Sequence, residues 1–188
     1  CAFSCDPTGN LVHVDQLVPR AATFAAVPLL KEREFLASTD HWFRPVFLAS
    51  GPDGALYVCD MYRKVIEHPD YLPQEVRKRT DFESGKNQGR IWRIAHKGRS
   101  AGKSPRAEFG SADVAKLVAL MADENAWIRA TAERLLWERG DADAVQNLKA
   151  ALGSNAASGV QYRRLRMLGI LEGLHDAAAA AYLRSENV

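Results

Sequence analysis

The chain changes its sequence pattern near the middle, and this change most constrains its fold. Residues 1–97 contain short β-type runs broken by turn residues, whereas residues 111–188 contain Ala- and Leu-rich stretches of helical period and no proline. The segment 98–110 between them is rich in Gly, Ser, Lys and Pro, which suits a linker. We therefore predict a β domain over 1–97, a linker over 98–110 and a helical domain over 111–188.

The composition excludes several classes of protein. Hydrophobic residues make up 47% of the 188 residues, enough to bury real cores, and 25 basic against 23 acidic side chains leave a net charge of +2. This weak field disfavours a dedicated nucleic-acid binder. No apolar run approaches the roughly 18 residues of a membrane span. Because the first residue is Cys1, with neither an initiator Met nor a signal peptide pattern, we expect a piece of a longer protein.

The cysteines indicate neither a disulfide scaffold nor a metal site. Cys1, Cys5 and Cys59 are an odd set without the paired spacing of a zinc site. The CxxCH signature is absent, so we expect no covalent haem in this chain. We interpret the three residues as buried structural thiols.

The clearest local unit is a β-hairpin between Arg44 and Asp60. Two apolar runs, 45–49 and 55–59, flank the turn-forming sequence Gly-Pro-Asp-Gly. The alternating segment 90–94 is predicted to be an outer strand of the same sheet. A hairpin reverses the chain, so the residues leading into its first strand and those leaving its second should meet at one end of the sheet.

The β half contains a weak internal repeat. The segment 2–6 ends in Cys-Asp, as does 56–60, and each is followed by a Gly-containing turn and a strand. The spacing of the two copies is near the ~40 to 50 residues of propeller blades. We predict the C-terminal blades, about two, of an incomplete β-propeller whose other blades lie upstream.

The helical half also repeats, because residues 127–148 align with residues 162–183. Helical pairs of this length are the units of α-solenoids, so we predict HEAT-like repeats. Two apolar stripes of helical spacing are expected to face the core: Val114, Leu117, Val118 and Met121 in one, and Ile128, Ala132 and Leu135, less completely, in the other. Three residues are expected to cap helices: Ser111, Asp141 and Asp176.

Residues 38–44 and 60–63 would gather at one end of the predicted hairpin, with Asp6 joining them by the repeat. Planar donors for a carboxylate or phosphate and flat faces for a ring occur together there, and they suit an anionic aromatic cofactor. The cofactor-binding candidates are Arg44, Arg63, Trp42 and Tyr62.

Other residues at this end suit acid–base or metal chemistry. The catalytic candidates are His41 and Asp60, with His68 as a further base, and Ca²⁺ would find hard oxygen ligands in Asp6, Asp40 and Asp60. The alternative is structural: the carboxylates cap turns and pair with the arginines, and the aromatics fill the sheet. His13 and Asp15 are expected on the solvated face of an alternating strand. The long segment 64–88 is expected to include helical turns near 72–79.

The segment 34–69, which reads EFLASTD, WFRPV, GPDGALYV, DMYR and IEHP in turn, resembles the large bacterial membrane-bound dehydrogenases. The early stretch 5–13 and the closing segment 89–94 are also similar to theirs. The resemblance implies a propeller of the glucose/sorbosone dehydrogenase type followed by HEAT-type repeats, commonly with a c-type haem domain elsewhere.

The resemblance also implies a function: oxidation of a sugar or related alcohol outside the cytoplasm, in the periplasm or at a membrane. Pyrroloquinoline quinone is the implied acceptor, with Ca²⁺ as a further cofactor. Arg44 matches the arginine that contacts the quinone in related proteins. The implied partners within the parent protein are the upstream blades and the haem domain, so we expect this part alone to be inactive. The alternative is a non-catalytic scaffold that binds a protein or a glycan.

Overall fold

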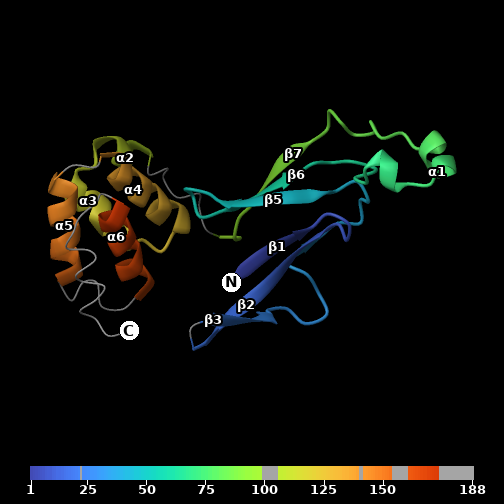
Figure 1. Ribbon diagram of the computed structural model, residues 1–188. Coiled ribbons are helices and arrows are strands. Elements are labelled where there is room, and N and C mark those ends of the chain that lie inside the picture. Colours follow the sequence, from blue (N-terminus) through green and yellow to red (C-terminus); the bar gives the residue numbers. More distant parts are fainter. Residues whose placement is uncertain (22, 99–105, 140–141, 154–160, 174–188) are drawn as a thin grey trace. The chain divides into compact units, whose positions relative to one another are not determined.

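The computed structural model describes residues 1–21, 23–98, 106–139, 142–153 and 161–173. The chain divides into two compact units, Cys1–Gly51 with Ala55–Arg99, and Pro52–Gly54 with Ser100–Val188. The first contains the strands and is called the β unit, and the second contains five helices among its described residues and is called the helical unit (Figure 1).

The β unit contains two open antiparallel sheets. In the first, β2 (Leu11–Arg20) pairs with β1 (Ala2–Asp6) on one side, and with β3 (Thr23–Pro28) and β4 (Leu36–Ala37) at its two ends on the other. In the second, β6 (Leu56–Asp60) lies between β5 (Pro45–Ser50) and β7 (Arg90–Ile94). The two sheets approach each other where β1 lies beside β5.

The predicted hairpin is confirmed as β5 and β6. The Gly51 N–H donates to the Ala55 carbonyl at 2.8 Å, and Gly54 has a φ of +75°, which a side chain would disfavour. The predicted outer strand is confirmed as β7, which within the described ranges pairs with β6 alone and leaves Ile91 68% exposed.

The expectation of propeller blades is wrong. The two sheets have four and three strands, and neither closes among the described residues. The repeated Cys-Asp strands also occupy different places. In the part of the chain that the structure describes, β1 pairs only with the strand that follows it, whereas β6 is the central strand of its sheet. Similar local sequence therefore does not produce a repeated pairing, since pairing is decided by contacts distant in sequence.

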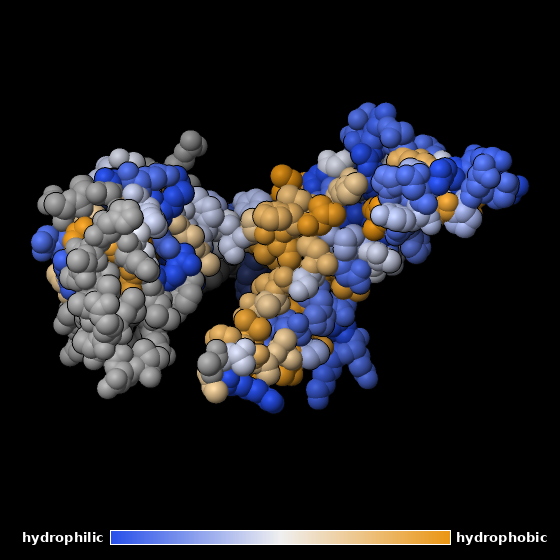
Figure 2. Space-filling model, in the orientation of Figure 1, coloured by the Kyte–Doolittle hydropathy of each residue, from blue (hydrophilic) through white to orange (hydrophobic). Residues whose placement is uncertain are grey.

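The core of the β unit lies between the two sheets. Val12, Phe43 and Val58 are buried there, each no more than 6% exposed, and partly buried residues pack around them: Leu36, Leu48, Leu56 and Ile94. Away from this core the strands expose apolar side chains, including Phe24 and Phe47, as Figure 2 shows over β5 and the first sheet. The small core makes polar contacts at the ends of the strands important for the fold.

The excursion from Met61 to Gly89 joins β6 to β7. It contains a 3₁₀ turn, η1 (Pro69–Tyr71), and a short helix, α1 (Gln74–Arg79), neither of which buries a residue. The helix confirms the expectation of helical turns near 72–79. Gly85 has a φ of +87° and packs so closely that an added Cβ would lie 2.3 Å from the Tyr62 carbonyl oxygen.

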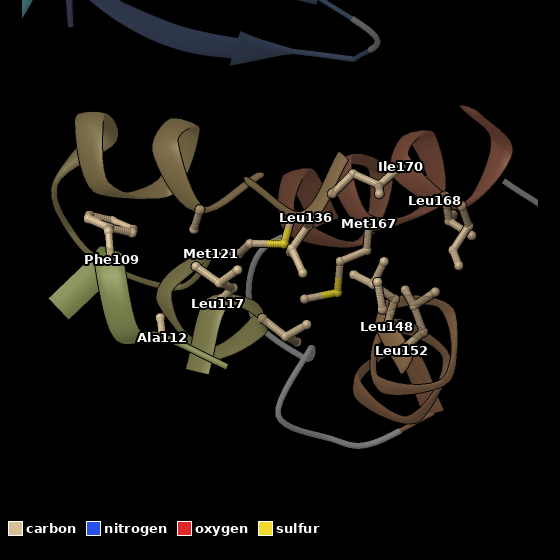
Figure 3. Packing of buried hydrophobic residues seen from close by; sticks show 14 residues of the cluster. Phe109, Ala112, Leu117, Met121, Leu136, Leu148, Leu152, Met167, Leu168 and Ile170 are labelled. Atoms are coloured by element: carbon tan, nitrogen blue, oxygen red, sulfur yellow. The ribbon is translucent and has the colours of Figure 1, made fainter. Parts of the chain in front are cut away.

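The helical unit packs α2 (Arg106–Ser111), α3 (Val114–Leu120), α4 (Ala126–Arg139), α5 (Ala142–Gly153) and α6 (Gln161–Gly173) around one core. Figure 3 shows its apolar side chains pointing toward one another, among them Leu117, Met121, Leu136, Leu148 and Met167. The predicted stripes are confirmed, since Leu117 and Ala132 are fully buried.

The expectation of a HEAT-like solenoid is wrong. The described helices are short and share a single core instead of stacking as repeated pairs. Ser111 ends α2 and caps no following helix, because the cap of α3 is Asp113, whose carboxylate accepts the Lys116 N–H. The predicted linker is helical from Arg106 onward, and the rest of it after Gly98 lies outside the described residues, as do Asp141, Asp176 and the second half of the later repeat.

Candidate functional site

The predicted meeting of the two ends of the hairpin is confirmed. The Met61 N–H donates to the Arg44 carbonyl at 2.9 Å, and the Arg63 N–H donates to the Trp42 carbonyl at 3.0 Å. The antiparallel pairing of β5 and β6 therefore continues past Pro45 and Asp60 into the segments 40–44 and 60–63. The side chains that the sequence singled out lie on these two short extensions.

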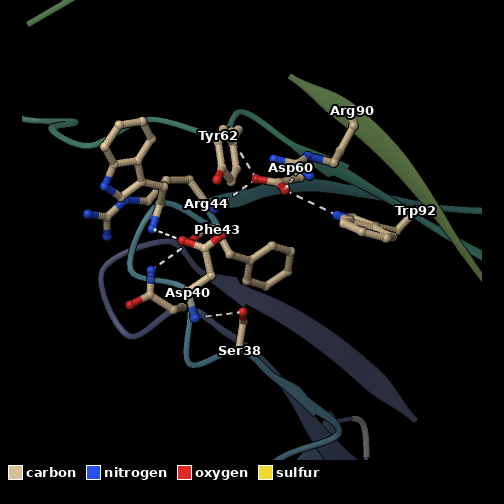
Figure 4. A network of polar contacts seen from close by, with 10 residues as sticks. Ser38, Asp40, Phe43, Arg44, Asp60, Tyr62, Arg90 and Trp92 are labelled. Atoms are coloured by element: carbon tan, nitrogen blue, oxygen red, sulfur yellow. Dashed lines mark hydrogen bonds and ion pairs between the residues drawn. The ribbon is translucent and has the colours of Figure 1, made fainter. Parts of the chain in front are cut away.

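Asp60 is the buried centre of this region (Figure 4). Its Oδ1 accepts the backbone N–H groups of Arg44 and Tyr62, both at 2.9 Å. Its Oδ2 accepts the indole N–H of Trp92 at 3.1 Å and lies 3.4 Å from Nε of Arg90. Four donors thus surround a side chain that is 1% exposed. This carboxylate organises the region, and a carboxylate so fully hydrogen-bonded is poorly placed to act as a base or metal ligand.

Arg44 serves as a second anchor. Its guanidinium donates to three backbone carbonyls, those of Pro7 at 2.7 Å, Arg63 at 3.1 Å and Lys64 at 3.1 Å. These bonds join the turn after β1 to the segment after β6. They engage three of the five N–H donors of the group that we matched to a quinone contact.

Arg63 differs from Arg44 because its Nη1 is buried without a hydrogen-bond partner among the described residues. The pKa of Glu83 is lowered mainly by the hydrogen bond and charge of Lys86, and the charge of Arg63 lowers it further. Burying an unpaired donor costs free energy unless solvent or a ligand satisfies it. Of the two predicted guanidinium groups, Arg63 is therefore the one with an unused buried donor.

Flat side chains follow one another from the two extensions onto β7, and we call them the aromatic ladder: Trp42, Tyr62, Arg90 and Trp92. The rings of Trp42 and Tyr62 lie 5.7 Å apart between centroids, tilted by 55°. The Arg90 guanidinium lies 3.8 Å from the Tyr62 centroid and 5.5 Å from that of Trp92. These contacts are cation–π interactions in which Arg90 sits between two rings.

The conformation of Tyr62 is held in place from two sides. Its φ of +49° is unfavourable for a residue with a side chain. Asp60 accepts its N–H, and Gly85 packs against its carbonyl oxygen. The strained turn at Tyr62 points the ring toward Arg90 and Trp42, which explains how the ladder keeps its order.

Sequence reasoning missed Arg90, Trp92 and Asn10. Arg90 is the cross-strand partner of Asp60 in the register of β6 and β7, so a correct register would have found it. Asn10 is buried and donates to the carbonyls of Phe43 at 2.6 Å and His41 at 3.3 Å. The turn-forming sequence around Asn10 was its only signal, and its partners are distant along the chain.

The remaining predicted residues do not form one donor set. Asp40 accepts the Trp42 N–H at 2.9 Å, and Asp6 accepts the Gly9 N–H at 2.8 Å, so each caps its own turn. His41 is exposed, and His68 accepts the Asp70 N–H at the start of η1. Within the described part of the chain no three His, Cys, Asp or Glu residues are placed to hold a metal ion.

The cysteines differ from the expectation of buried thiols. Cys1 is exposed, and Cys5 and Cys59 are half-buried free thiols. Burial raises the pKa of the Cys5 thiol, and the nearby Cys59 raises it further. A raised pKa keeps the thiol protonated near neutral pH, so it is a poor nucleophile.

Comparison with known proteins identifies a family for the β unit. A family of proteins described as a domain of unknown function, DUF7133, matches residues 1–98, more than half of the chain. The chain therefore belongs to the DUF7133 family. No curated protein and no solved structure matches it. None of the helices in the described ranges has the length and apolar character needed to cross a bilayer.

Proposed function

We propose that the aromatic ladder of the β unit binds a sugar or a related alcohol, and that it does so as part of an extracytoplasmic dehydrogenase. The observation that carries the binding role is the ladder itself, four flat side chains in sequence, three of which belong to residues that contact Asp60. The dehydrogenase role is supported by the resemblance of the segment 34–69 to the bacterial membrane-bound dehydrogenases. The sugar class follows from the chemistry of the ladder and from that resemblance.

The ladder offers both kinds of contact that a sugar ring needs. The C–H faces of a sugar pack on aromatic rings, and its hydroxyls accept hydrogen bonds from planar donors and donate to carboxylates. Trp92 is 43% exposed and Trp42 is half-buried, so both ends of the ladder meet solvent. Arg90, between them, presents guanidinium N–H groups to a ligand hydroxyl. The ordered side chains lose little conformational freedom when the ligand binds.

The described residues fit pyrroloquinoline quinone in part. Trp42 supplies a flat face for its rings, and Arg63 supplies the buried, unpaired donor for a carboxylate or a quinone oxygen. When bound, such a quinone supplies the acceptor for the electrons of the alcohol. The part of this chain is to orient the rings and to place positive charge beside them. We therefore give the quinone-contacting role to Arg63 instead of Arg44, because the Arg44 guanidinium already donates to three carbonyls.

The described residues do not fit Ca²⁺ as predicted. The two oxygens of Asp60 already accept or face four donors, and Asp6 and Asp40 cap separate turns. A calcium ion takes six to eight oxygen ligands gathered around one point, and among the described residues these carboxylates are not gathered in that way. We therefore assign no step to a metal.

The second candidate function is binding without catalysis, by an interaction scaffold that holds a glycan. The observation favouring it is that the carboxylates of Asp40 and Asp60 already accept hydrogen bonds from groups within the protein. A general base needs a free acceptor within reach of the substrate hydroxyl. His41 is exposed on the same segment and is the remaining candidate for that role.

The two functions are separated by titrating the full chain with glucose, a polyol, an oligosaccharide and pyrroloquinoline quinone, using calorimetry. Trp42→Ala should weaken binding of the sugar ligands by about tenfold, which is the loss of one stacking contact. Tyr71→Ala is the matched control, since Tyr71 is 82% exposed on η1 and lies outside the ladder. Binding of the quinone as well supports the dehydrogenase, and binding of glycans alone supports the scaffold. If no ligand binds, or if both variants behave alike, the proposal is wrong.

A further inference from the structure

A second cluster of charged groups lies on the first sheet and takes no part in the site above. His13 of β2 has a carboxylate at each ring nitrogen. Its Nδ1 lies 2.6 Å from Oε2 of Glu34, and its Nε2 lies 3.2 Å from Oδ1 of Asp15. We call His13, Asp15 and Glu34 the carboxylate clasp. The sequence placed His13 and Asp15 on a solvated face, but it gave no sign of Glu34.

The clasp holds the crossover from β3 to β4, residues 29–35, against β2. The Leu29 N–H donates to the Val14 carbonyl at 3.1 Å at one end of the crossover. At the other end, Phe35 packs edge-on against Phe3, with ring centroids 4.9 Å apart. Glu34 supplies the ionic contact beside that ring pair. The crossover leads directly into β4 and then into residues 38–44.

Both contacts of the clasp need a protonated imidazole. The imidazolium ion donates from both nitrogens, whereas neutral histidine has one N–H and presents a lone pair on its other nitrogen. In the neutral state one carboxylate therefore faces a lone pair, and the other keeps a hydrogen bond but loses the attraction of the imidazolium charge. The hydrogen bonds of Glu34 and then Asp15 raise the pKa of His13 above the ordinary value for histidine, against a smaller opposing effect of desolvation.

The other charged groups near the clasp do not share this role. On the face that carries His13, β1 contributes Asp6, opposite Leu11, while β3 and β4 contribute no titratable residue. The crossover itself also carries Lys31, Glu32 and Arg33, all exposed. The groups that raise the pKa of the imidazole are Glu34, with the largest effect, and Asp15.

We propose that the carboxylate clasp is a proton-dependent latch, which fastens the 29–35 crossover to β2 when His13 is charged and loosens it when His13 is neutral. The sign follows from the direction of the shift. A group whose pKa is raised by folding stabilises the folded state fully below its unfolded pKa, and this stability is lost as the pH rises through the folded value. The latch is therefore closed below the ordinary pKa of histidine and loosens as the pH rises through the raised pKa of His13 in the folded protein.

Limited proteolysis of the full chain tests the latch, because the exposed Lys31 and Arg33 are trypsin sites within the crossover. Cleavage there is measured relative to cleavage at Lys97, an exposed site outside the crossover, so that the pH dependence of trypsin cancels. In the unmodified chain we expect the ratio to rise about threefold from about pH 6.5 to about pH 9. The titration of the His13 ring, followed by NMR, should have its midpoint within that rise.

Two variants keep the test decisive. Glu34→Gln removes the charge of the clasp and should give a high ratio at every pH. His13→Arg keeps a positive charge with planar donors and should give a low ratio at every pH. Far-UV circular dichroism checks that both fold. A constant ratio in the unmodified chain, or an equal rise in both variants, would overturn the latch.

Discussion

Two strands of the β unit end in the same Cys-Asp pair, and the two aspartates differ in burial and in the number of their hydrogen-bond donors. Asp6, at the end of β1, is exposed and accepts one N–H from its own turn. Asp60, at the end of β6, is buried and has donors from three segments of the chain. The difference lies in the neighbours, because β6 is a central strand and β1 has only β2 as its paired strand. A motif at a strand end therefore gains its role from the strands beside it.

The largest effect is expected from removing the buried carboxylate. Asp60→Ala should lower the free energy of unfolding of the β unit by about 3 kcal/mol, because it leaves two backbone N–H groups and the Trp92 indole without an acceptor. Asp60→Asn should cost less, since its carbonyl oxygen keeps the two backbone bonds. Hydrogen exchange of the β6 amides during denaturant titration measures this for the β unit alone. Equal stability of Asp60→Ala and the unmodified chain would contradict the comparison.

The next effect tests the support of the strained turn after Asp60. Gly85→Ala should cost about 2 kcal/mol, because its Cβ would lie 2.3 Å from the Tyr62 carbonyl oxygen and its φ is positive. Gly54→Ala is the matched control, since Gly54 also has a positive φ but has no atoms within 4 Å of an added Cβ. The difference between the two variants, measured by the same exchange experiment, isolates the packing contact. A difference near zero would show that Gly85 does not hold Tyr62.

A smaller effect is expected where the two strand ends are joined. Arg44→Lys should cost about 1.5 kcal/mol, because one ammonium group cannot replace the planar donors to the carbonyls of Pro7, Arg63 and Lys64. Amide exchange should increase after β1 and after β6 together. If only one of these turns responds, Arg44 does not link them.

The smallest effect is expected at the exposed strand end. Asp6→Ala should change the stability of the β unit by no more than about 0.5 kcal/mol, since it removes one solvent-exposed turn contact. Chemical denaturation of Asp6→Ala and Asp60→Ala, side by side under the same conditions, measures the difference. A loss equal to that of Asp60→Ala would mean that the two strand ends are equivalent after all.

Local chemistry allowed some parts of this structure to be predicted. The Gly-Pro-Asp-Gly turn defined the hairpin, and the hairpin brought Trp42 and Tyr62 together as expected. The helical spacing around Leu117 likewise identified a buried face. In each case the interacting residues are near in sequence, or are joined by one reversal of the chain.

Features set by distant pairing were not predictable. The partner of Asp60 depends on the register of β6 with β7, across the long excursion, and Glu34 reaches His13 across two strands and a crossover. The propeller was expected from a repeat of local sequence, but the residues of one strand do not determine which other strand pairs with it. The hydrogen bonds from Arg44 to carbonyls could not be predicted for the same reason, because Pro7 is distant from Arg44 in sequence and meets it only in the folded chain.

The excursion between β6 and β7 has a consequence for how the second sheet is assembled. Because η1 and α1 contain no buried residue, cleavage of the backbone within them would break the chain between β6 and β7 without removing a core residue. The last strand, Arg90–Ile94, would then remain attached through its pairing with β6 and through the contacts of Arg90 and Trp92 with Asp60. The β unit is thus built so that two separate polypeptides, divided at α1, retain the contacts needed to reassemble as one sheet.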